Sequence, residues 1–317
     1  MIKIWQKKGF LPMLLLPLSY IYSLVHKTKF QLTKSKKYSK KIICIGNITT
    51  GGAGKTPVAI AIAKLLLSKG KKVCFAVKNY KSKTDSRYLI TKNSKYDELV
   101  IEEAYETAQV ADTYVASARR QSIDFACNSD ADIIIVDDGM QNNSFFKDKT
   151  ALVIDGDQKT GNDFIIPAGP MRESLKEGIK KADFLVIINM KDSNYIENLA
   201  SYGKPIFEME STSFIKSHDK KRKYFAFCGI GFPEKFFNSL KSMGVKIVKT
   251  KKFPDHYNYK DKDLRDLSSL ARRNNASLIT TRKDAIKINN IEDLYVANYE
   301  LVIKDSDKLL EALDEKS

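Results

Sequence analysis

A glycine-rich segment, GNITTGGAGKTP at Gly46–Pro57, carries the residue types that hold phosphate groups. Small residues let successive backbone N–H groups turn inward on an anion at the positive end of a helix. Lys55 would reach the β- and γ-phosphates of a nucleotide, and the Thr56 hydroxyl would complete the shell of a magnesium ion. An ordinary strand-to-helix turn is the alternative. The residues expected to contact the nucleotide are Thr49, Thr50, Gly51, Gly52, Ala53, Gly54, Lys55 and Thr56.

Two consecutive carboxylates, Asp137 and Asp138, follow the apolar run ADIIIV at Ala131–Val136. An apolar strand that ends in aspartate is a Walker-B-like pattern, because such a carboxylate can hold magnesium directly or through water. Two aspartates after a strand are also a common turn, so the interpretation depends on the glycine-rich segment upstream. We expect Thr56, Asp137 and Asp138 to be the metal ligands.

An arginine and a histidine complete the set of candidate catalytic side chains. Arg172 lies in a loop rich in Gly and Pro at Gly161–Glu173, where it could neutralise charge on a transferred phosphoryl group or pair with Glu173 as a surface cap. His256 follows an aspartate that could orient it, in the turn Phe253–Tyr257, although a turn histidine without a catalytic role fits equally. The other histidines, His26 and His218, lie in basic segments that indicate no catalytic role.

The elements expected to position these residues alternate between strand and helix. Lys41–Ile45 is a β-branched run typical of a buried parallel strand, and Val58–Leu67 has helical length and composition. We therefore expect an α/β fold with a P-loop NTPase-like doubly wound parallel sheet, whose ligand crevice lies at the carboxyl ends of the strands. The further strands expected in this sheet lie at 72–77, 114–117, 131–136, 150–155, 183–189 and 205–210.

A polar and basic stretch at 216–223 suggests a domain boundary, since a second strand and helix series follows it with strands at 224–228, 245–248 and 277–280. We expect three parts. These are a membrane anchor with a basic flank at 1–40, a P-loop core at 41–217, and a second, smaller α/β domain at 218–317.

The composition indicates a globular protein with an anionic partner. Of 317 residues, 43% are hydrophobic and 29% are charged, which argues against large-scale disorder. The formal net charge of +16 favours nucleic acid, a membrane surface or a phosphorylated substrate, unless the lysines simply cover a solvated surface. Nucleic acid is disfavoured because no aromatic interleaving or nucleic-acid motif accompanies the basic residues. The four scattered cysteines are typical of a reduced cytosolic protein.

The N-terminal segment predicts a membrane-associating helix. Gly9–Val25 carries no charge, contains Pro12 and Pro17, and is barely long enough to span a bilayer. We favour an interfacial anchor over a span, with a signal peptide or a buried N-terminal helix as the alternatives. The lysines that follow suit an anionic membrane surface. They are Lys27, Lys29, Lys34, Lys36, Lys37, Lys40 and Lys41.

Taken together, these motifs resemble tetraacyldisaccharide 4'-kinase, the lipid A 4'-kinase family of Gram-negative bacteria, over nearly the whole chain. The glycine-rich segment matches that family's TxGGxGKT pattern, including Thr49 in place of a glycine. The other motifs that carry the resemblance are DDGMQ at Asp137–Gln141, PAGPMRE at Pro167–Glu173, GIGFPEKFF at Gly229–Phe237, FPDH at Phe253–His256 and TTRKDA at Thr280–Ala285.

The resemblance implies transfer of the γ-phosphoryl group from ATP, with Mg²⁺, to the 4'-hydroxyl of a tetraacyldisaccharide 1-phosphate. It places this reaction at the cytoplasmic face of the bacterial inner membrane, with a glycolipid substrate and an anionic membrane surface as partners. It also implies a catalytic role for Glu102, which stands where the family has a catalytic Asp. Together with the residues identified above, the expected catalytic side chains are Glu102, Asp138, Arg172 and His256.

Four departures indicate a divergent member of the family. Glu102 stands where the family's GDE segment has a catalytic Asp, and the family's RGYG reads Lys78–Lys81 here. Asn142 replaces a His, and Arg282 replaces a Glu. A membrane-bound P-loop NTPase without a lipid acceptor and a decayed kinase therefore stay open as alternatives. The sequence also leaves the acyl-chain specificity and the oligomeric state open.

Overall fold

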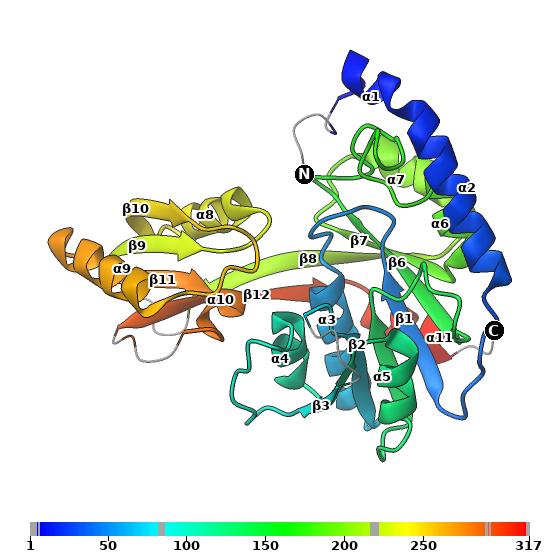
Figure 1. Cartoon of the computed structure of the whole chain (residues 1–317), viewed down its shortest axis with the longest axis horizontal. Coiled ribbons are helices and arrows are strands. Elements are labelled where there is room, and N and C mark those ends of the chain that lie inside the picture. Colours follow the sequence, from blue (N-terminus) through cyan, green and yellow to red (C-terminus); the bar gives the residue numbers. More distant parts are fainter. Residues whose placement is uncertain are drawn as a thin grey trace.

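One continuous mixed sheet runs through the molecule (Figure 1). The computed structural model describes residues 5, 7–81, 86–215, 222–288, 291 and 293–314. Within them, 12 strands pair in the order β10-β9-β11-β12-β8-β7-β6-β1-β5-β2-β4-β3. All neighbours are parallel except β8 with β12 and β3 with β4. The expected α/β class with a P-loop NTPase-like parallel sheet is confirmed, and the two antiparallel pairs add to it.

The strands at the centre of the sheet are short apolar runs that are buried on both faces. β1 (Lys41–Gly46) lies between β5 (Ile133–Asp137) and β6 (Lys149–Asp155). The end of β1, where the glycine-rich segment begins, therefore adjoins the end of β5, which carries Asp137. The remaining strands are β2 (Val73–Lys78), β3 (Arg87–Ile90), β4 (Thr113–Ala116), β7 (Phe184–Ile188), β8 (Ile206–Ile215), β9 (Lys223–Cys228), β10 (Lys246–Lys252), β11 (Ser277–Thr281) and β12 (Leu294–Ile303).

Helices cover the sheet and complete its cores. α3 (Lys55–Ser68) lays Val58, Ala59 and Ile62 against the central strands, because its apolar residues occupy most of its circumference. The other helices are α1 (Phe10–Leu14), α2 (Leu16–Leu32), α4 (Glu102–Ala108), α5 (Arg119–Ala126), α6 (Leu175–Lys181), α7 (Ser193–Ala200), α8 (Pro233–Ser242), α9 (Asp261–Arg273), α10 (Arg282–Ala285) and α11 (Ser306–Asp314).

The long antiparallel pair of β8 and β12 connects two lobes (Figure 1). We call residues 41–215 the first lobe and residues 222–288 the second lobe. The second lobe has cores of its own around Tyr224 and Phe225. After β12 the chain returns to the first lobe, where Leu309 and Leu313 of α11 join the core of α3. The division at 217 and 218 stays a prediction, and His218 lies outside the described residues.

The N-terminal helices lie along one side of the first lobe and are held by polar contacts (Figure 1). Ser19 donates its hydroxyl to the carbonyl of Ile165 over 2.7 Å, and the indole of Trp5 donates to the carbonyl of Pro167 over 3.0 Å. None of the described helices combines the length and apolarity needed to cross a membrane. The large hydrophobic side chains that they expose are Phe10, Leu11, Met13, Leu14, Leu18, Tyr20, Ile21, Leu24, Val25 and Leu32.

Two strands lie outside the expectations from the sequence. β3 falls in a polar stretch, where only Tyr88 and Ile90 of its four residues turn toward the core. β12 is only partly buried along most of its length, and Asn298 and Glu300 interrupt its apolar pattern. β3 pairs antiparallel with β4 at the edge of the sheet, and β12 pairs antiparallel with β8, which is distant in the sequence. The local periodicity of a sequence does not reveal such pairing.

Candidate active site

The glycine-rich segment forms a loop between β1 and α3, at the carboxyl end of the central strand. The side-chain amide (Nδ2) of Asn47 donates to the carbonyl of Thr49 over 2.7 Å, and the backbone N–H of Thr50 donates to the carbonyl of Pro170 over 2.8 Å. Gly54 caps α3 with a left-handed φ of 82°. The loop is therefore fixed in front of the N-terminus of α3, the geometry that favours a bound phosphate.

Two glycines of this loop cannot be replaced without a shift of their neighbours. A Cβ on Gly54 would lie 2.6 Å from Cδ1 of Ile188, and a Cβ on Gly51, whose φ is 101°, would lie 3.3 Å from the ring of Phe232. Phe232 belongs to the second lobe, so that lobe lies directly over the phosphate loop. Its sequence position, just before α8, gives no local sign of this contact.

Asp137 lies beside Thr56, as the sequence predicts. The hydroxyl of Thr56 donates to Oδ2 of Asp137 over 2.5 Å, while Oδ1 is buried without a hydrogen-bond partner. Burial raises the pKa of Asp137 to about 6, although the charge of Lys55 and the hydroxyl of Thr56 oppose this rise. Arg119 donates to the main-chain oxygen of Asp137 over 2.9 Å and so fixes the end of β5.

This oxygen set fits a hard divalent cation. A buried carboxylate oxygen without a partner is rare in proteins, and Mg²⁺ prefers carboxylate, hydroxyl and water oxygens. Oδ1 of Asp137 and the Thr56 hydroxyl meet that requirement at the front of the phosphate loop. Asp138, the third expected ligand, follows directly.

Asp138 and Arg172 meet across the same loop. Nη1 of Arg172 donates to Oδ1 of Asp138 over 2.9 Å, and Nζ of Lys55 lies 3.7 Å from that oxygen. Burial acts to raise the pKa of Asp138, but the charges of Lys55, Arg172 and Arg119 outweigh burial and hold it below its usual value. Arg172 thus lies at the site, and its alternative pairing with Glu173 as a surface cap is wrong.

Glu173 has partners of its own, which explains why Arg172 is available. It accepts a hydrogen bond from Nε2 of Gln141 over 2.9 Å and pairs with Lys181. The same amide of Gln141 donates to the carbonyl of Asn47 over 2.7 Å. The DDGMQ segment, the PAGPMRE loop and the phosphate loop are therefore joined by side-chain hydrogen bonds.

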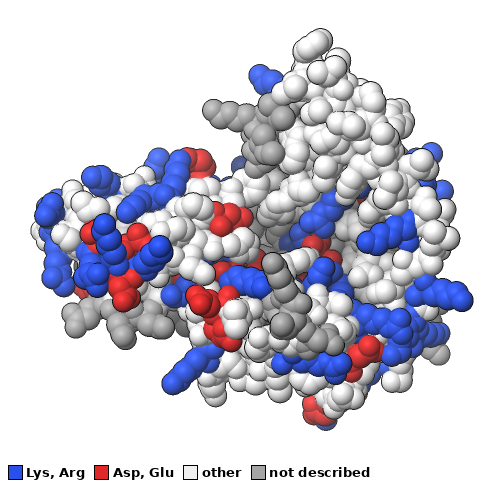
Figure 2. Space-filling view, viewed as in Figure 1, with Lys and Arg blue, Asp and Glu red and all other residues white. Residues whose placement is uncertain are grey.

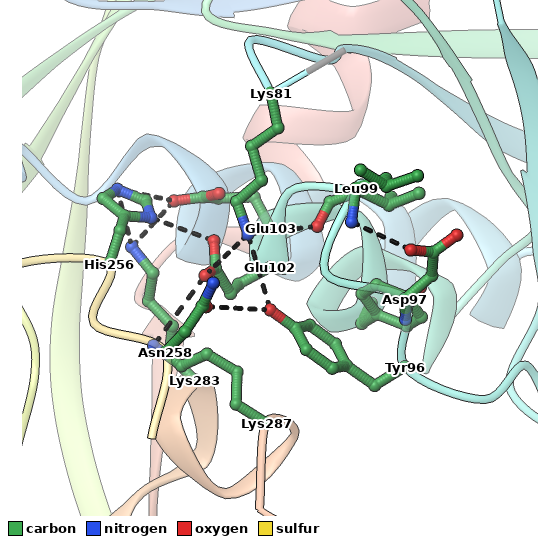
Figure 3. A network of polar contacts seen from close by, with 12 residues as sticks. Lys81, Tyr96, Asp97, Leu99, Glu102, Glu103, His256, Asn258, Lys283 and Lys287 are labelled. Atoms are coloured by element: carbon green, nitrogen blue, oxygen red, sulfur yellow. Dashed lines mark hydrogen bonds and ion pairs between the residues drawn. The ribbon is translucent and has the colours of Figure 1, made fainter. Parts of the chain in front are cut away.

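A second polar cluster surrounds Glu102, the first residue of α4 (Figure 3). Its side chain is 0% exposed. Oε1 accepts from Nζ of Lys81 at 3.1 Å, and Oε2 lies 2.9 Å from Nδ1 of His256, which comes from the second lobe. The structure therefore brings together Glu102 and His256, two of the expected catalytic residues.

The pKa values of this pair are displaced in opposite directions. Burial acts to raise the pKa of Glu102, but the hydrogen bonds from His256 and Lys81 overcome it and lower the pKa to about 2. The hydrogen bond to Glu102 raises the pKa of His256, against burial and the charge of Lys283. Each group thus favours the charged form of the other.

Lysines surround the acidic members of this cluster. Nζ of Lys283 lies 2.8 Å from Oε1 of Glu103 and 3.3 Å from Nε2 of His256. Glu102, Glu103 and His256 are close enough together to hold a metal ion. However, the ammonium groups of Lys81 and Lys283 already balance the two carboxylates, so we interpret this cluster as a hydrogen-bond network.

The two clusters are electrostatic neighbours. Burial raises the pKa of Glu106 to about 7, and Glu103 and Asp137 add to the rise. Glu103 in turn contributes to the raised pKa of Asp137. Glu103 and Glu106 of α4 are therefore close enough to Asp137 for their charges to affect one another.

Several side chains of the site escape prediction from the sequence. Arg119, Lys81, Lys283 and Glu106 lie in segments whose local pattern is that of an ordinary helix start or polar turn. Arg119 is only 6% exposed, but no local pattern in the sequence indicates that this arginine is buried.

Comparison with known proteins identifies the family. The family model described as tetraacyldisaccharide-1-P 4'-kinase matches residues 11–317. A tetraacyldisaccharide 4'-kinase of Rickettsia akari is 37% identical over 99% of this chain and 97% of its own length, and one of Rickettsia canadensis is 35% identical over the same shares.

The chain belongs to the tetraacyldisaccharide 4'-kinase family.

A solved structure agrees with this membership. The crystal structure of LpxK from Aquifex aeolicus in complex with ATP is 26% identical, with a TM-score of 0.76, and the match covers 96% of this chain and 98% of that one. At the clearest departure from the family's motifs, the longer side chain of Glu102 still reaches His256. Lys78 stands in place of the arginine of RGYG, and its Nζ lies 4.8 Å from the ring centroid of Tyr80.

Proposed function

We propose that this chain transfers the γ-phosphoryl group of ATP to the 4'-hydroxyl of a tetraacyldisaccharide 1-phosphate, a step of lipid A biosynthesis. The observation that carries the proposal is the presence, in one structure, of an intact phosphate loop and a hydrogen-bonded pair of the buried Glu102 and the partly exposed His256. The first set of residues suits a nucleotide and the second suits the hydroxyl that attacks it. The names and full-length match of its relatives support the same acceptor.

The phosphate loop would hold the nucleotide. The backbone and side chains of Thr49–Thr56 would surround the β- and γ-phosphates, with Lys55 and Arg172 stabilising charge on the transferred group. Thr56, Asp137 and Asp138 would hold Mg²⁺, which neutralises phosphate charge and aligns the leaving group when bound. Asp138 also keeps Lys55 and Arg172 together through the contacts at 3.7 and 2.9 Å.

His256 is the member of the pair that can touch the acceptor. Its side chain is 44% exposed, whereas that of Glu102 is 0% exposed. The imidazole donates Nδ1–H to Glu102, so Nε2 is the atom that can accept a proton, and Nζ of Lys283 lies 3.3 Å from it in the free enzyme. As O4' bonds to the γ-phosphorus, the bond from phosphorus to the β,γ-bridging oxygen breaks, ADP leaves, and the hydroxyl proton moves to Nε2.

The alternatives differ in what they require of this pair. An NTPase that phosphorylates nothing needs the phosphate loop but no base for an alcohol. A decayed kinase would have lost contacts within the site, yet Thr56 with Asp137 and Glu102 with His256 are hydrogen-bonded. The kinase interpretation therefore accounts for more of the site.

A membrane surface is the expected setting for this reaction. The surface over α1 shows few charged side chains, while Lys and Arg gather farther along toward the C-terminal end of α2 (Figure 2). The apolar residues would enter the lipid and the lysines would meet anionic head groups. Within the proposal, this surface is the cytoplasmic face of the bacterial inner membrane, where an acylated substrate would be presented.

The test is the dependence of ADP formation on the acceptor. Purified full-length protein with ATP and Mg²⁺ in detergent micelles is expected to form ADP only when tetraacyldisaccharide 1-phosphate is added. Equal ADP formation with and without the acceptor would favour the NTPase. No ADP under either condition, from folded protein that binds ATP, would favour a decayed kinase.

A further inference from the structure

Lys287 is a buried lysine that the proposed reaction does not use directly. It follows α10 in the second lobe, and its side chain is 1% exposed. Nζ lies 3.2 Å from Oδ1 of Asp284 in the same lobe. It lies 3.8 Å from Oε1 of Glu102 in the first lobe (Figure 3). We propose that Lys287 is a positioning residue, which ties the second lobe to Glu102 so that His256 meets this carboxylate. The kinetic part of this inference rests on the proposed function.

The two carboxylates that Lys287 joins are fully buried. Glu102 and Asp284 are both 0% exposed, and each has an oxygen within 4 Å of the same ammonium group. Loss of that charge would leave the buried Asp284 carboxylate without its ion pair, and Glu102 with only Lys81 and His256, which is unfavourable for buried carboxylates. Lys287 therefore adds an attraction between the lobes to those that His256 makes with Glu102 and Lys283 makes with Glu103.

Asp284 connects Lys287 to the backbone of His256. Its Oδ2 accepts the N–H of Gly229 over 3.0 Å and the hydroxyl of Thr281 over 2.7 Å. The carbonyl of Gly229 in turn accepts the N–H of His256 over 3.2 Å. A shift of Asp284 would thus move the turn that carries the histidine.

Lys287 has no direct contact with the imidazole. The charged groups that face His256 are Glu102, Glu103, Asp255 and Lys283. Lys287 instead lies over the ring of Tyr259, 5.6 Å from its centroid, and its Nζ makes no hydrogen bond of good geometry. It therefore acts through its charge, and it can affect His256 only through Glu102 or through the backbone path.

The direct test is the pKa of His256, measured by NMR titration of the free enzyme. The chain has only three histidines, so the signal is assigned by comparison with a His256→Gln variant. In the wild type we expect a pKa above the ordinary 6.5, since Glu102 raises it. In Lys287→Met the hydrogen bond between the lobes weakens, and the pKa falls toward 6.5. This measurement needs no turnover, so it stands even if the proposed function fails.

The direction of the change separates positioning from simple loss of charge. Removal of a positive charge near an unmoved Glu102 and His256 pair would leave the pKa of His256 unchanged or raise it. A folded Lys287→Met protein with an unchanged or raised pKa would therefore overturn the proposal. Lys287→Arg keeps the charge, and a cavity of about 250 Å³ lined in part by Lys287 and Tyr259 gives room for the larger group. We expect it to retain the wild-type pKa.

Two further variants control for folding. The double variant Lys287→Met/Asp284→Asn also removes the negative charge of Asp284, which Lys287→Met alone would leave buried without its ion pair. The amide oxygen of the new Asn can still accept the N–H of Gly229. The double variant therefore replaces the single variant in this test if the single variant does not fold. It also lacks the ion pair, and we expect the same fall in pKa; an unchanged value would again contradict the proposal. Lys41→Met removes a partly buried lysine that pairs with Asp314 away from the site, and it should leave the pKa unchanged.

Kinetics add a second readout. If the pair acts on the acceptor, Lys287→Met should lower kcat at least about tenfold, a fraction of the usual effect of losing a general base. KM for ATP should stay within about twofold, because Lys287 contacts no residue of the phosphate loop. A rise in KM for ATP with an unchanged kcat would contradict a role at the Glu102 and His256 pair.

Discussion

Nδ1 of His256 lies 2.9 Å from Oε2 of Glu102, although the two residues are 154 positions apart in the chain. Glu102 begins a helix of the first lobe, and His256 lies in a turn of the second lobe with a left-handed φ of 58°. A non-glycine residue keeps such a backbone conformation only where its surroundings hold it there. This contact joins the lobe that carries the phosphate loop to the lobe that carries the proposed base.

The first prediction concerns pH. A base must be neutral to accept a proton, so kcat/KM should fall as the pH falls through the pKa of His256. Glu102 raises this pKa above 6.5, so the midpoint of the fall should lie above 6.5. In Glu102→Gln the negative charge is lost, and the midpoint should move to lower pH. A pH profile with the same midpoint in both proteins would show that the pair does not act as proposed.

The second prediction concerns charge on the transferred group. Lys55→Met should lower kcat by about 10²- to 10³-fold, because a preorganised cation at the phosphates is lost. The matched control is Lys64→Met in the same helix, where the lysine pairs with the partly exposed Glu300. It should keep wild-type turnover. Similar rates for Lys55→Met and the wild type would remove the phosphate loop from the mechanism.

The glycine-rich loop and the paired aspartates could be predicted from the sequence because each is a local pattern at the end of an apolar strand. The contact of Thr56 with Asp137 follows from the adjacency of β1 and β5 that an open parallel sheet favours. The lysine partners of Glu102 and Glu103 could not be found in this way. Lys81, Lys283 and Lys287 are three of 54 Lys and Arg residues, and only the packing of the two lobes distinguishes them.

The third prediction concerns the stability of the loop. Gly54→Ala should lower the free energy of unfolding by about 1–3 kcal/mol, because its φ is 82° and the new Cβ would lie 2.6 Å from Ile188. Gly70→Ala is the control, with a φ of 73° and no atom within 4 Å of the new Cβ. Urea unfolding should show a larger loss for Gly54→Ala, and Ile188→Val should recover part of it. Equal losses at both glycines would rule out the contact with Ile188 as a cause.

The fourth prediction concerns the membrane surface. Replacement of Leu14, Leu18 and Ile21 by Ser should lower binding to vesicles of phosphatidylethanolamine and phosphatidylglycerol at least about tenfold, since apolar area on α1 and α2 would no longer enter the lipid.

The control for this prediction replaces Leu89, Val248 and Val302, which are exposed on strands away from these helices. That protein should sediment with vesicles like the wild type. Higher salt should weaken binding of both, because the lysines act through screened charge. Unchanged binding of the helix variant would place the membrane contact elsewhere.

The most direct measurement follows labelled γ-phosphate from ATP into the lipid product. Wild-type protein with tetraacyldisaccharide 1-phosphate should give a labelled lipid that keeps its label through mild acid, which removes the glycosidic 1-phosphate but leaves a phosphate ester at the 4'-position. Glu102→Gln should bind ATP normally and form this product much more slowly. Label that appears only as free phosphate, or that mild acid removes from the lipid, would contradict the account.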